Sequence, residues 1–538
     1  MGYADLGCFG STNNSSPHID SLARDGLRFT QWMSAASICT PSRAAMQTGR
    51  LPARFGMTAN SLPWRVLITP DQPTGLPDSE LTVATLLKRK GYSTGMSGKW
   101  HLGVSNKTTQ WAHLPRQHGY DSWLGMPYSN MLACKQGQET DFFCLMMANN
   151  TVVQQPFKAE NMTQEFTRHA IDFLEWNAAG GDYPASSGMG SGAGTASSRE
   201  SNAPLANGAR KPFFFMFNFM HVHTPLFSSP RFTNVSAGGP FGDNVAEMDD
   251  AVGQVLAALD RLGLANDTLV LLTSDNGPYQ EEGWQNVGRT GVTQATRLKG
   301  GKGQVWEGGL RMPAVARWPG RVAPGKTTDA LVGSVDILPT LLSLAGEELP
   351  SDRHYDGRDM APVLFAAEPA TAPSAHEFMF HYCGSNVTAV RHIVNGSTYK
   401  LHLASQVWQS DKRPSPLCIQ CCPYDWEHYE PFGGGGSLCN CAGKHITKHD
   451  PPLVFRMNDD KTESKPISRD AFPGGASAFD SEIATVKAAL AEHYATVAPS
   501  PDQMKSLPNK KLQPCCTGGL YKKGNCNCDL YVPGRAYP

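Results

Sequence analysis

Apolar runs of strand length alternate with helical segments through residues 1–346, and this alternation limits the possible fold more than any other feature of the chain. The run Phe213-Phe214-Phe215-Met216-Phe217, inside a predicted strand at Pro212–Met220, is typical of strands buried on both faces of a parallel sheet. Thr268–Thr273 is a second such run. Strands alternating with helices predict a layered α/β fold with a mostly parallel sheet.

Periodicity and turn residues predict the remaining elements. The predicted helices and strand of this part are Ser16–Phe29, Leu81–Lys90, Met162–Trp176, Val245–Leu262 and Val335–Leu344, with a strand at Tyr92–Lys99. Residues 178–210, rich in Gly, Ser and Ala, are expected to form a flexible surface insertion.

The character of the chain changes after Gly346, where short β-like runs replace the alternation. These runs are Phe378–Cys383, Val387–Val394 and Thr398–Leu403, and a helix is predicted at Glu482–Ala495. The chain has 538 residues, enough for a large and a small domain. We therefore predict a large α/β domain at 1–346 and a cysteine-rich α+β domain with an antiparallel sheet at 347–538.

The fourteen cysteines are concentrated in the second domain. They include Cys418, Cys421, Cys422, Cys439 and Cys441, then Cys515, Cys516, Cys526 and Cys528, while Cys134 and Cys144 are a plausible local pair. Cys418-x-x-Cys421 has the spacing of zinc ligands. Adjacent cysteines favour the alternative, a disulfide framework formed in an oxidising compartment.

Glycosylation sequons point to the same compartment. They occur at Asn106, Asn149, Asn161, Asn234, Asn266, Asn386 and Asn395. We therefore predict a secretory or lysosome-like location, although no signal segment follows Met1. The net charge of −1 gives no argument for a basic surface that would bind nucleic acid, and no apolar run has the length of a membrane span.

The segment Cys39-Thr40-Pro41-Ser42-Arg43, followed by Thr48-Gly49-Arg50, carries the strongest chemical signal. Pro41 suits a first helical turn, which places Arg43 one turn from the Cys39 sulfur. A nucleophile at a helix start lies where anions are favoured. A free cysteine is more often a small buried apolar residue, so the complete pattern is what favours a functional one.

Four further segments place polar side chains where strands end, the usual ligand-binding edge of an open α/β sheet. Lys99 and His101 alternate as in an extended strand end, which predicts that both point to one side. His223 follows the Phe-rich strand, and Lys302 lies in a glycine-rich loop that lets the backbone approach an anion. Asp275-Asn276 follows the second buried strand and offers oxygen ligands for Ca²⁺ or Mg²⁺. Singly, each segment is also compatible with an ordinary turn or surface position.

Together these residues suit the transfer of a sulfuryl or phosphoryl group from an anionic ester. The Cys39–Arg50 pattern and the four segments resemble, in order, those of the type I sulfatases. The second domain is similar to the branch that contains arylsulfatase A and steroid sulfatase, on Phe380-His381-Tyr382-Cys383, His449-Asp450-Pro451-Pro452-Leu453 and the cysteine-rich tail. The resemblance implies an alkaline-phosphatase-like catalytic domain.

The resemblance also implies a role for each residue. Cys39 would be oxidised to formylglycine by a formylglycine-generating enzyme, and the hydrated aldehyde would attack sulfur and later eliminate sulfate. Arg43 and His101 would hold and deprotonate the diol. Lys99, His223 and Lys302 would bind sulfate, with His223 or Lys302 protonating the leaving oxygen. Asp275, Asn276 and the formylglycine at position 39 would bind one cation, usually Ca²⁺, with Mg²⁺ possible.

One departure concerns the first strand. Family members carry two consecutive aspartates at its end, both cation ligands, just before the segment that begins at Gly2-Tyr3. We therefore expect that the natural chain begins upstream of Met1. Two alternatives to a sulfatase remain at this point: a phosphonate or phosphate ester hydrolase of the same superfamily, and an inactive binder of sulfated ligands.

Overall fold

The computed structural model describes residues 1–58, 68–129, 145–154, 157–181, 210–279, 288–407 and 441–507, with residues 509 and 512. The helices in these ranges are α1 (Pro17–Arg24), α2 (Cys39–Thr48), α3 (Val83–Arg89), α4 (Ala159–Ala178), α5 (Gly239–Arg261), α6 (Glu307–Leu310), α7 (Ile337–Leu344), α8 (Ala361–Leu364) and α9 (Gly475–Ala495). The strands are β1 (Leu27–Met33), β2 (Ser93–Lys99), β3 (Ser122–Met126), β4 (Met146–Ala148), β5 (Thr151–Gln154), β6 (Phe213–Asn218), β7 (Val270–Thr273), β8 (Arg311–Arg317), β9 (Lys326–Thr328), β10 (Val332–Gly333), β11 (Phe378–Cys383), β12 (Asn386–Val394), β13 (Ser397–Gln406) and β14 (Ile446–Arg456).

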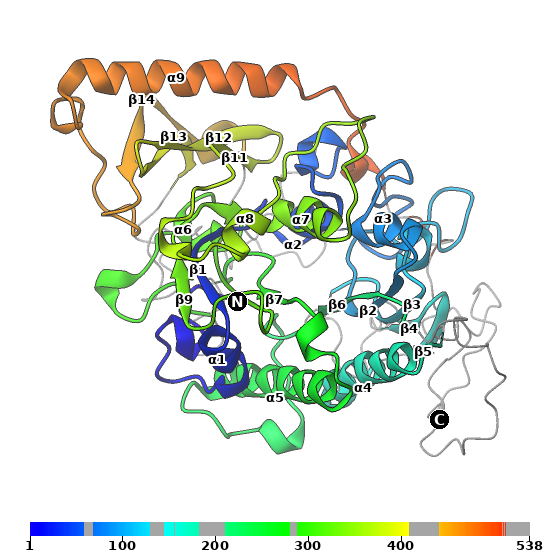
Figure 1. Ribbon diagram of the computed structural model, residues 1–538. Coiled ribbons are helices and arrows are strands. Elements are labelled where there is room, and N and C mark those ends of the chain that lie inside the picture. The colour runs from blue at the N-terminus through cyan, green and yellow to red at the C-terminus, as the bar shows by residue number, and fades with distance from the viewer. Residues whose placement is uncertain are drawn as a thin grey trace, which may run out of the picture.

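The larger domain holds two five-stranded sheets between two layers of helices, α4 and α5 on one side and α2, α3 and α7 on the other (Figure 1). One sheet has the order β5-β4-β3-β2-β6, with β2 parallel to both β3 and β6. The other has the order β10-β1-β8-β7, with β9 also on β1, and β8 runs antiparallel to both its neighbours. The predicted α/β class is confirmed, in mixed sheets.

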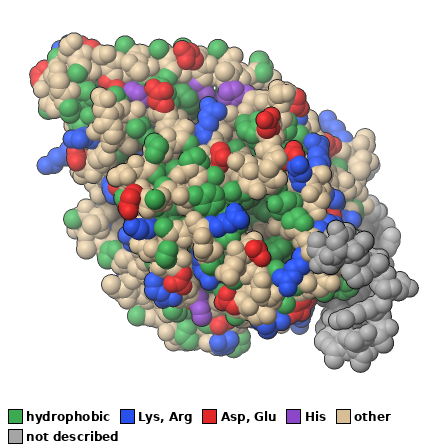
Figure 2. Space-filling view, viewed as in Figure 1, with side chains coloured by type: hydrophobic (Ala, Val, Ile, Leu, Met, Phe, Trp, Pro, Cys, Tyr) green, Lys and Arg blue, Asp and Glu red, His purple; other side chains and the backbone are tan. Residues whose placement is uncertain are grey.

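A cavity of about 680 Å³ lies between these sheets, lined by β6 and β7. Each of these strands is the last of its sheet among the described residues. Their side chains are half-buried, whereas the apolar sequence predicted strands buried on both faces. The cavity is the physical reason, because it leaves one side of each strand without packed neighbours. Figure 2 shows hydrophobic side chains across the middle of the viewed face, where Figure 1 places β6 and β7.

The prediction of one helix over Ser16–Phe29 was wrong at its C-terminal end, because α1 stops at Arg24 and β1 begins at Leu27. A side chain at Gly26 would meet the Ala316 carbonyl oxygen at 2.1 Å, so the chain passes close against β8 there. From Leu27 to Thr30 buried and half-buried residues alternate, which is the period of a strand, and the last three residues of β1 are all buried.

The C-terminal domain is an antiparallel sheet of order β11-β12-β13-β14, with α9 along it (Figure 1). β14 was not among the predicted strands, and it contains Pro451 and Pro452. β14 lies at the edge of the sheet, where a missing backbone N–H is tolerated. We propose that the domains divide at Gly346, which follows α7 with a φ of 71°.

One disulfide joins Cys383, at the end of β11, to Cys441. The other cysteines that were predicted to form disulfides or to bind zinc lie outside the described residues, as does most of the predicted insertion at 178–210. Within the described ranges, none of the helices combines the length and the apolar character needed to cross a membrane.

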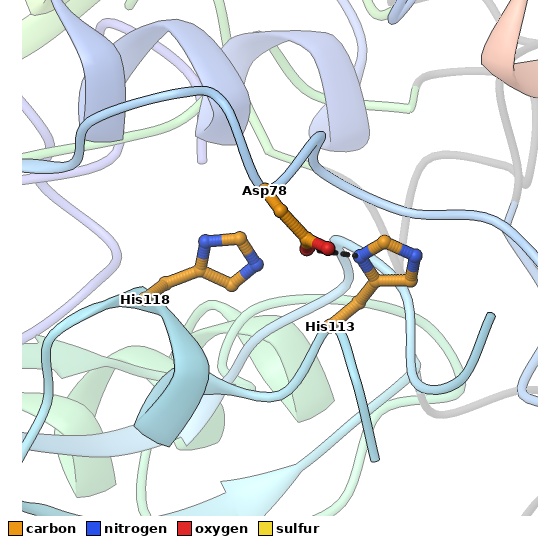
Figure 3. A group of neighbouring side chains, drawn as sticks. All are labelled: Asp78, His113 and His118. Carbon is orange, nitrogen blue, oxygen red and sulfur yellow. Dashed lines mark ion pairs between the residues drawn. The ribbon is translucent and has the colours of Figure 1, made fainter. Parts of the chain in front are cut away.

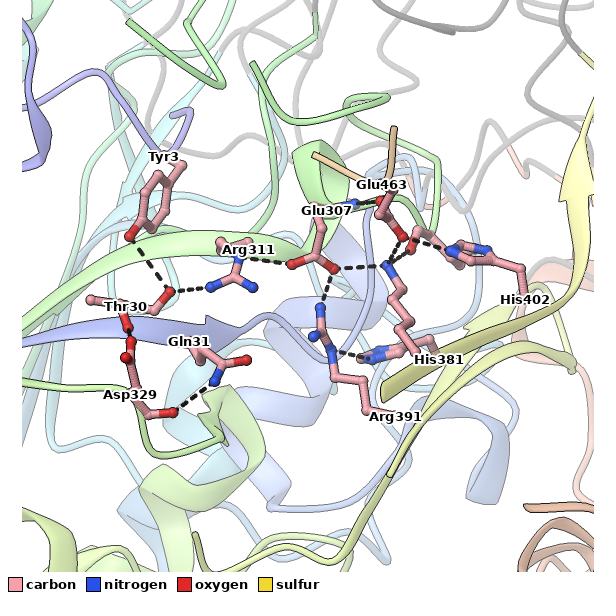
Figure 4. Close-up of polar contacts among 12 residues, drawn as sticks. Tyr3, Thr30, Gln31, Glu307, Arg311, Asp329, His381, Arg391, His402 and Glu463 are labelled. Carbon is pink, nitrogen blue, oxygen red and sulfur yellow. Dashed lines mark hydrogen bonds and ion pairs between the residues drawn. The ribbon is translucent and has the colours of Figure 1, made fainter. Parts of the chain in front are cut away.

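A buried network of charges joins the two domains (Figure 4). Glu307 of α6 accepts hydrogen bonds from Arg311 Nε (2.7 Å) and Lys400 Nζ (2.8 Å), and also from Arg391. Lys400 is 2.9 Å from Glu463, and all of these side chains are fully buried. The network fixes the loop that precedes α6 against the antiparallel sheet of the C-terminal domain. We refer to Glu307, Arg311, Arg391, Lys400 and Glu463 as the junction cluster.

Candidate active site

Cys39 is the first residue of α2 and lies on the inner side of the molecule, 4% exposed. Ile38 before it is extended, and the Ser42 amide donates to the Ile38 carbonyl at 3.1 Å. The helix dipole therefore presents its positive end at Cys39. At the other end of α2, Gly49 adopts a left-handed φ of 66°, and Arg50 forms an ion pair with Glu80 at 2.5 Å. The Thr-Gly-Arg half of the motif thus anchors the helix.

Arg43 connects α2 to two strand ends. Its Nε and Nη2 lie 3.0 and 2.9 Å from Asp275 Oδ2, and its Nη1 donates to the Lys99 carbonyl at 3.0 Å. Ser42 adds a hydrogen bond of 2.5 Å from its Oγ to the Asp275 carbonyl. The loop after β7 and the end of β2 are thereby held beside Cys39.

Lys99 and His101 both reach the site, but not through the extended chain that was predicted. Lys99 ends β2, and its Nζ donates to Ser129 Oγ at 2.9 Å. His101 has a left-handed φ of 62°, and its carbonyl accepts from Thr40 Oγ1 at 3.1 Å. The turn at His101, not strand alternation, brings its imidazole toward Cys39.

His223 and Lys302 complete the site from the opposite side. Lys302 Nζ lies 3.2 Å from His223 Nε2, and His223 Nδ1 is 2.6 Å from the Thr224 carbonyl. Because a carbonyl only accepts, Nδ1 carries the proton and Nε2 is the acceptor. The neighbouring His221 faces elsewhere: its Nε2 is 2.9 Å from Thr163 Oγ1.

The electrostatics of the site favour negative charge. Burial alone would raise the pKa of the Cys39 thiol, but Lys302, Lys99 and the nearby imidazoles of His101 and His223 lower that pKa well below its ordinary value. Burial lowers the pKa of Lys99 to about 8 and, with help from Lys99, that of His101 to about 3. Burial and Lys302 lower the pKa of His223 to about 4. Both imidazoles are therefore neutral near pH 7.

Asp275 and Asn276 have the geometry of cation ligands. Burial opposes ionisation of Asp275, yet Arg43 and Lys99 keep the pKa of its carboxyl below the ordinary value. Arg43 binds only Oδ2 of Asp275, which leaves Oδ1 for an ion. Asn276 Oδ1 is buried and has no hydrogen-bond partner among the described residues. This orphaned oxygen and the adjacent carboxylate fit a hard cation.

The structure thus brings every predicted site residue to one place. The cavity between the sheets is lined by Cys39, Arg43, Lys99, His223, Asp275, Asn276 and Lys302. The His101 imidazole lies near Cys39, and both its ring nitrogens are buried without a hydrogen-bond partner among the described residues. The loop after β7 packs closely against α6, since a side chain at Gly277 would meet the Gly308 carbonyl oxygen at 2.0 Å.

Sequence reasoning missed Ser129 and Asn218 as contributors. Ser129 follows β3, which is parallel to β2 with Met126 opposite Lys99, so the strand-end rule could have indicated it. Asn218 ends β6, and its Nδ2 donates to the Lys99 carbonyl at 3.1 Å. Both position Lys99.

Comparison with known proteins identifies the family. The family model described as Sulfatase matches residues 1–347, and that of the C-terminal region of aryl-sulfatase matches 374–528. The chain belongs to the sulfatase family. This sulfatase is 36% identical to steryl-sulfatase of Rattus norvegicus over 581 residues, covering 96% of this chain and 90% of the relative. It is 33% identical to arylsulfatase A of Homo sapiens over 547 residues, covering 98% and 92%.

A solved structure supports the fold of this sulfatase. PsFucS1 sulfatase from Pseudoalteromonas sp. superposes with a TM-score of 0.68 at 23% identity, covering 94% of this chain and 89% of that chain. The predicted membership of the arylsulfatase A and steroid sulfatase branch is confirmed, and with it the class of enzyme, a sulfuric ester hydrolase that uses the formylglycine chemistry general to the family.

Proposed function

We propose that this chain hydrolyses the sulfate ester of an aryl or sterol-like alcohol at the site around Cys39. The observation that carries the proposal is the convergence of a helix N-terminus, Lys99, Lys302 and Arg43 on one buried cysteine that is flanked by two neutral imidazoles. Fixed positive groups in a site with little water stabilise the charge that develops on a transferring sulfuryl group.

The residues divide into three tasks. Lys99 and Lys302 bind the sulfate oxygens, with His223 beside them. The neutral His101, close to position 39, accepts a proton from the nucleophile, and Arg43 orients the nucleophile. The hydrogen bond to Thr224 commits His223 Nδ1 as a donor, so Lys302, which faces Nε2, is the better source of the proton for the leaving oxygen.

Two groups that the family implies fit the residues present. Formylglycine, made from Cys39 by a formylglycine-generating enzyme, supplies a hydrated aldehyde as nucleophile. A divalent cation, for which we propose Ca²⁺ over Mg²⁺, would be held by Asp275, Asn276 and position 39, and would supply charge stabilisation next to the nucleophile.

The cavity between β6 and β7 supports the expectation of a preceding strand. Among the described residues, β6 and β7 each have one edge without a strand partner, and that edge faces the cavity. The two strands lead to the site residues Asn218 and Asp275. A strand placed there would join the two sheets and bring further oxygen ligands to the cation, which needs about six. Sequencing the 5′ end of the transcript checks this, and an in-frame stop directly upstream of Met1 would contradict it.

We also propose a secretory or lysosome-like location. The Cys383–Cys441 disulfide requires an oxidising compartment. The sequons at Asn161, Asn234, Asn266, Asn386 and Asn395 are on exposed residues, as glycosylation requires.

One pair of measurements on protein from the native host tests the function. Mass spectrometry of the peptide that contains Cys39 is expected to show conversion to formylglycine. Turnover of an aryl sulfate is expected to exceed that of the matched aryl phosphate and aryl phosphonate. A preference for the phosphonate would favour the alternative hydrolase, whereas anion binding with unmodified cysteine and no turnover would favour an inactive binder.

A further inference from the structure

Three side chains outside the active site form a cluster suited to a metal ion (Figure 3). Asp78, His113 and His118 each offer a ligand atom, and these atoms lie within 4.8 Å of one another. His113 Nδ1 is 3.6 Å from Asp78 Oδ1, and Figure 3 shows a ring nitrogen of His118 turned toward the same carboxylate. We call these three residues the His-His-Asp cluster.

The cluster contains a polar atom that the protein leaves without a partner. His118 is 2% exposed, and its Nε2 is buried with no hydrogen-bond partner among the described residues. Burial of an unsatisfied ring nitrogen costs free energy.

The imidazole ring of His113 is fixed by close contacts with the segment Gly75–Leu76. A side chain at Gly75 would meet His113 Cγ at 2.5 Å, so only glycine leaves room. Its Nδ1 is 3.0 Å from the Leu76 carbonyl. Asp78, in contrast, has a side chain that is 69% exposed and gives an ion a path from solvent.

We propose that the His-His-Asp cluster binds a single Zn²⁺ through His113, His118 and Asp78. Two imidazoles and one carboxylate are ligands that zinc accepts in tetrahedral sites, with water or the Leu76 carbonyl oxygen as the fourth. A hard ion such as Ca²⁺ prefers oxygens only, which separates this site from the one at Asp275. Binding through His113 Nδ1 would replace its hydrogen bond to the Leu76 carbonyl, and the ring would then carry its proton on Nε2.

The position of the cluster gives the ion a structural role. The His113 carbonyl accepts from Trp100 Nε1 at 2.7 Å, and the rings of Trp100 and His118 are 5.6 Å apart. Trp100 separates Lys99 from His101. A bound ion would therefore rigidify the segment that carries two active-site residues without touching the reacting atoms. The inference does not depend on the proposed function.

Metal content and zinc titration of the full-length protein test the site. After chelation, calorimetric titration with ZnCl₂ is expected to show one tight site per chain and to raise the melting temperature. His118→Phe keeps a ring beside Trp100 and is expected to abolish that site. Asp78→Asn is expected to weaken it about 10- to 100-fold, at least as much as loss of an outer-shell partner.

His18→Ala, at an exposed histidine elsewhere, serves as the control and is expected to bind zinc like the unmodified chain. No tight zinc binding would overturn the proposal. Equal binding by His118→Phe, or by Asp78→Asn if the first variant does not fold, would also overturn it, because the ion would then occupy another place such as the cysteine-rich segments.

Discussion

The junction cluster and the active site are both buried groups of charges, but they are balanced differently. In the junction cluster Arg311, Arg391 and Lys400 each contact Glu307, and Lys400 also contacts Glu463. In the active site Arg43 contacts Asp275, whereas the contact of Lys99 Nζ is with the Ser129 hydroxyl.

The difference shows what each charge is for. A buried ion with partners on every side defines one geometry, and removal of a partner leaves an expensive unpaired charge. A neutral hydroxyl compensates only part of the free energy that an ammonium loses when it is buried. The pKa of Lys99, which burial lowers to about 8, reflects this uncompensated part. An anionic substrate can recover that free energy on binding. We therefore propose that the junction cluster serves stability and that Lys99 serves substrate binding.

The largest expected effect is on turnover, from Cys39→Ala. The variant removes the proposed nucleophile, so turnover is expected to fall by about 10⁴- to 10⁶-fold, as when catalytic units are dismantled in other hydrolases. The melting temperature is expected to change little. Cys8→Ala is the control, since Cys8 is the other free cysteine of the described residues and lies outside the site. Comparable turnover in the two variants would remove Cys39 from the mechanism.

Glu307→Gln is expected to have the largest effect on stability. It leaves Arg311, Arg391 and Lys400 without their shared carboxylate, which we expect to cost about 3–5 kcal/mol of unfolding free energy. Urea denaturation measures it. The exposed pair Arg261–Glu175, broken by Glu175→Gln, should cost at most about 1 kcal/mol. Equal losses in the two variants would mean that the junction cluster contributes no more than a surface pair.

Much of the catalytic layout was predictable, because local rules act on it. Cys39 at a helix start, and Lys99, His223 and Asp275 at strand ends, follow from motif spacing and from the position of ligands in α/β sheets. His101 was identified as a site residue for an incorrect reason, since a left-handed turn aims it and its neighbours in sequence do not reveal that turn.

The junction cluster and the His-His-Asp cluster were not predictable. Glu307, Arg391 and Glu463 are far apart in the chain, and nothing local to any one of them indicates its partners. The same holds for Asp78 and His118, which meet because the loop before α3 packs against the segment between β2 and β3. Pairings of this kind depend on tertiary packing and not on periodicity.

Two equally buried lysines offer the most direct test of the comparison, since Lys99 is 2% and Lys400 0% exposed. Lys99→Met is expected to lower kcat/KM by about 10²- to 10³-fold, as for loss of one charge-stabilising donor. Its stability should stay the same or rise, because an incompletely balanced charge is removed. Lys400→Met should instead destabilise the fold. If Lys99→Met were the less stable variant, the division between binding and stability would be wrong.

The smallest expected effect concerns acid. Burial opposes ionisation of Glu463, but Lys400 and His402 hold the pKa of its carboxyl below the ordinary glutamate value. A carboxyl with a lowered folded pKa stabilises the fold fully above its unfolded pKa, and that stabilisation is lost as the pH falls through the folded value. Unfolding free energy should therefore decline below about pH 4.3.

Glu463→Gln removes one titrating group and should flatten that decline by at most about 1.4 kcal/mol per pH unit. Glu348→Gln, at an exposed position, should leave the slope unchanged. Urea denaturation at pH values from 3 to 6, roughly the range in which carboxyls titrate, measures both slopes. An unchanged slope in Glu463→Gln would mean that this carboxyl takes up no proton on unfolding, and the junction cluster would then owe its stability to Glu307 alone.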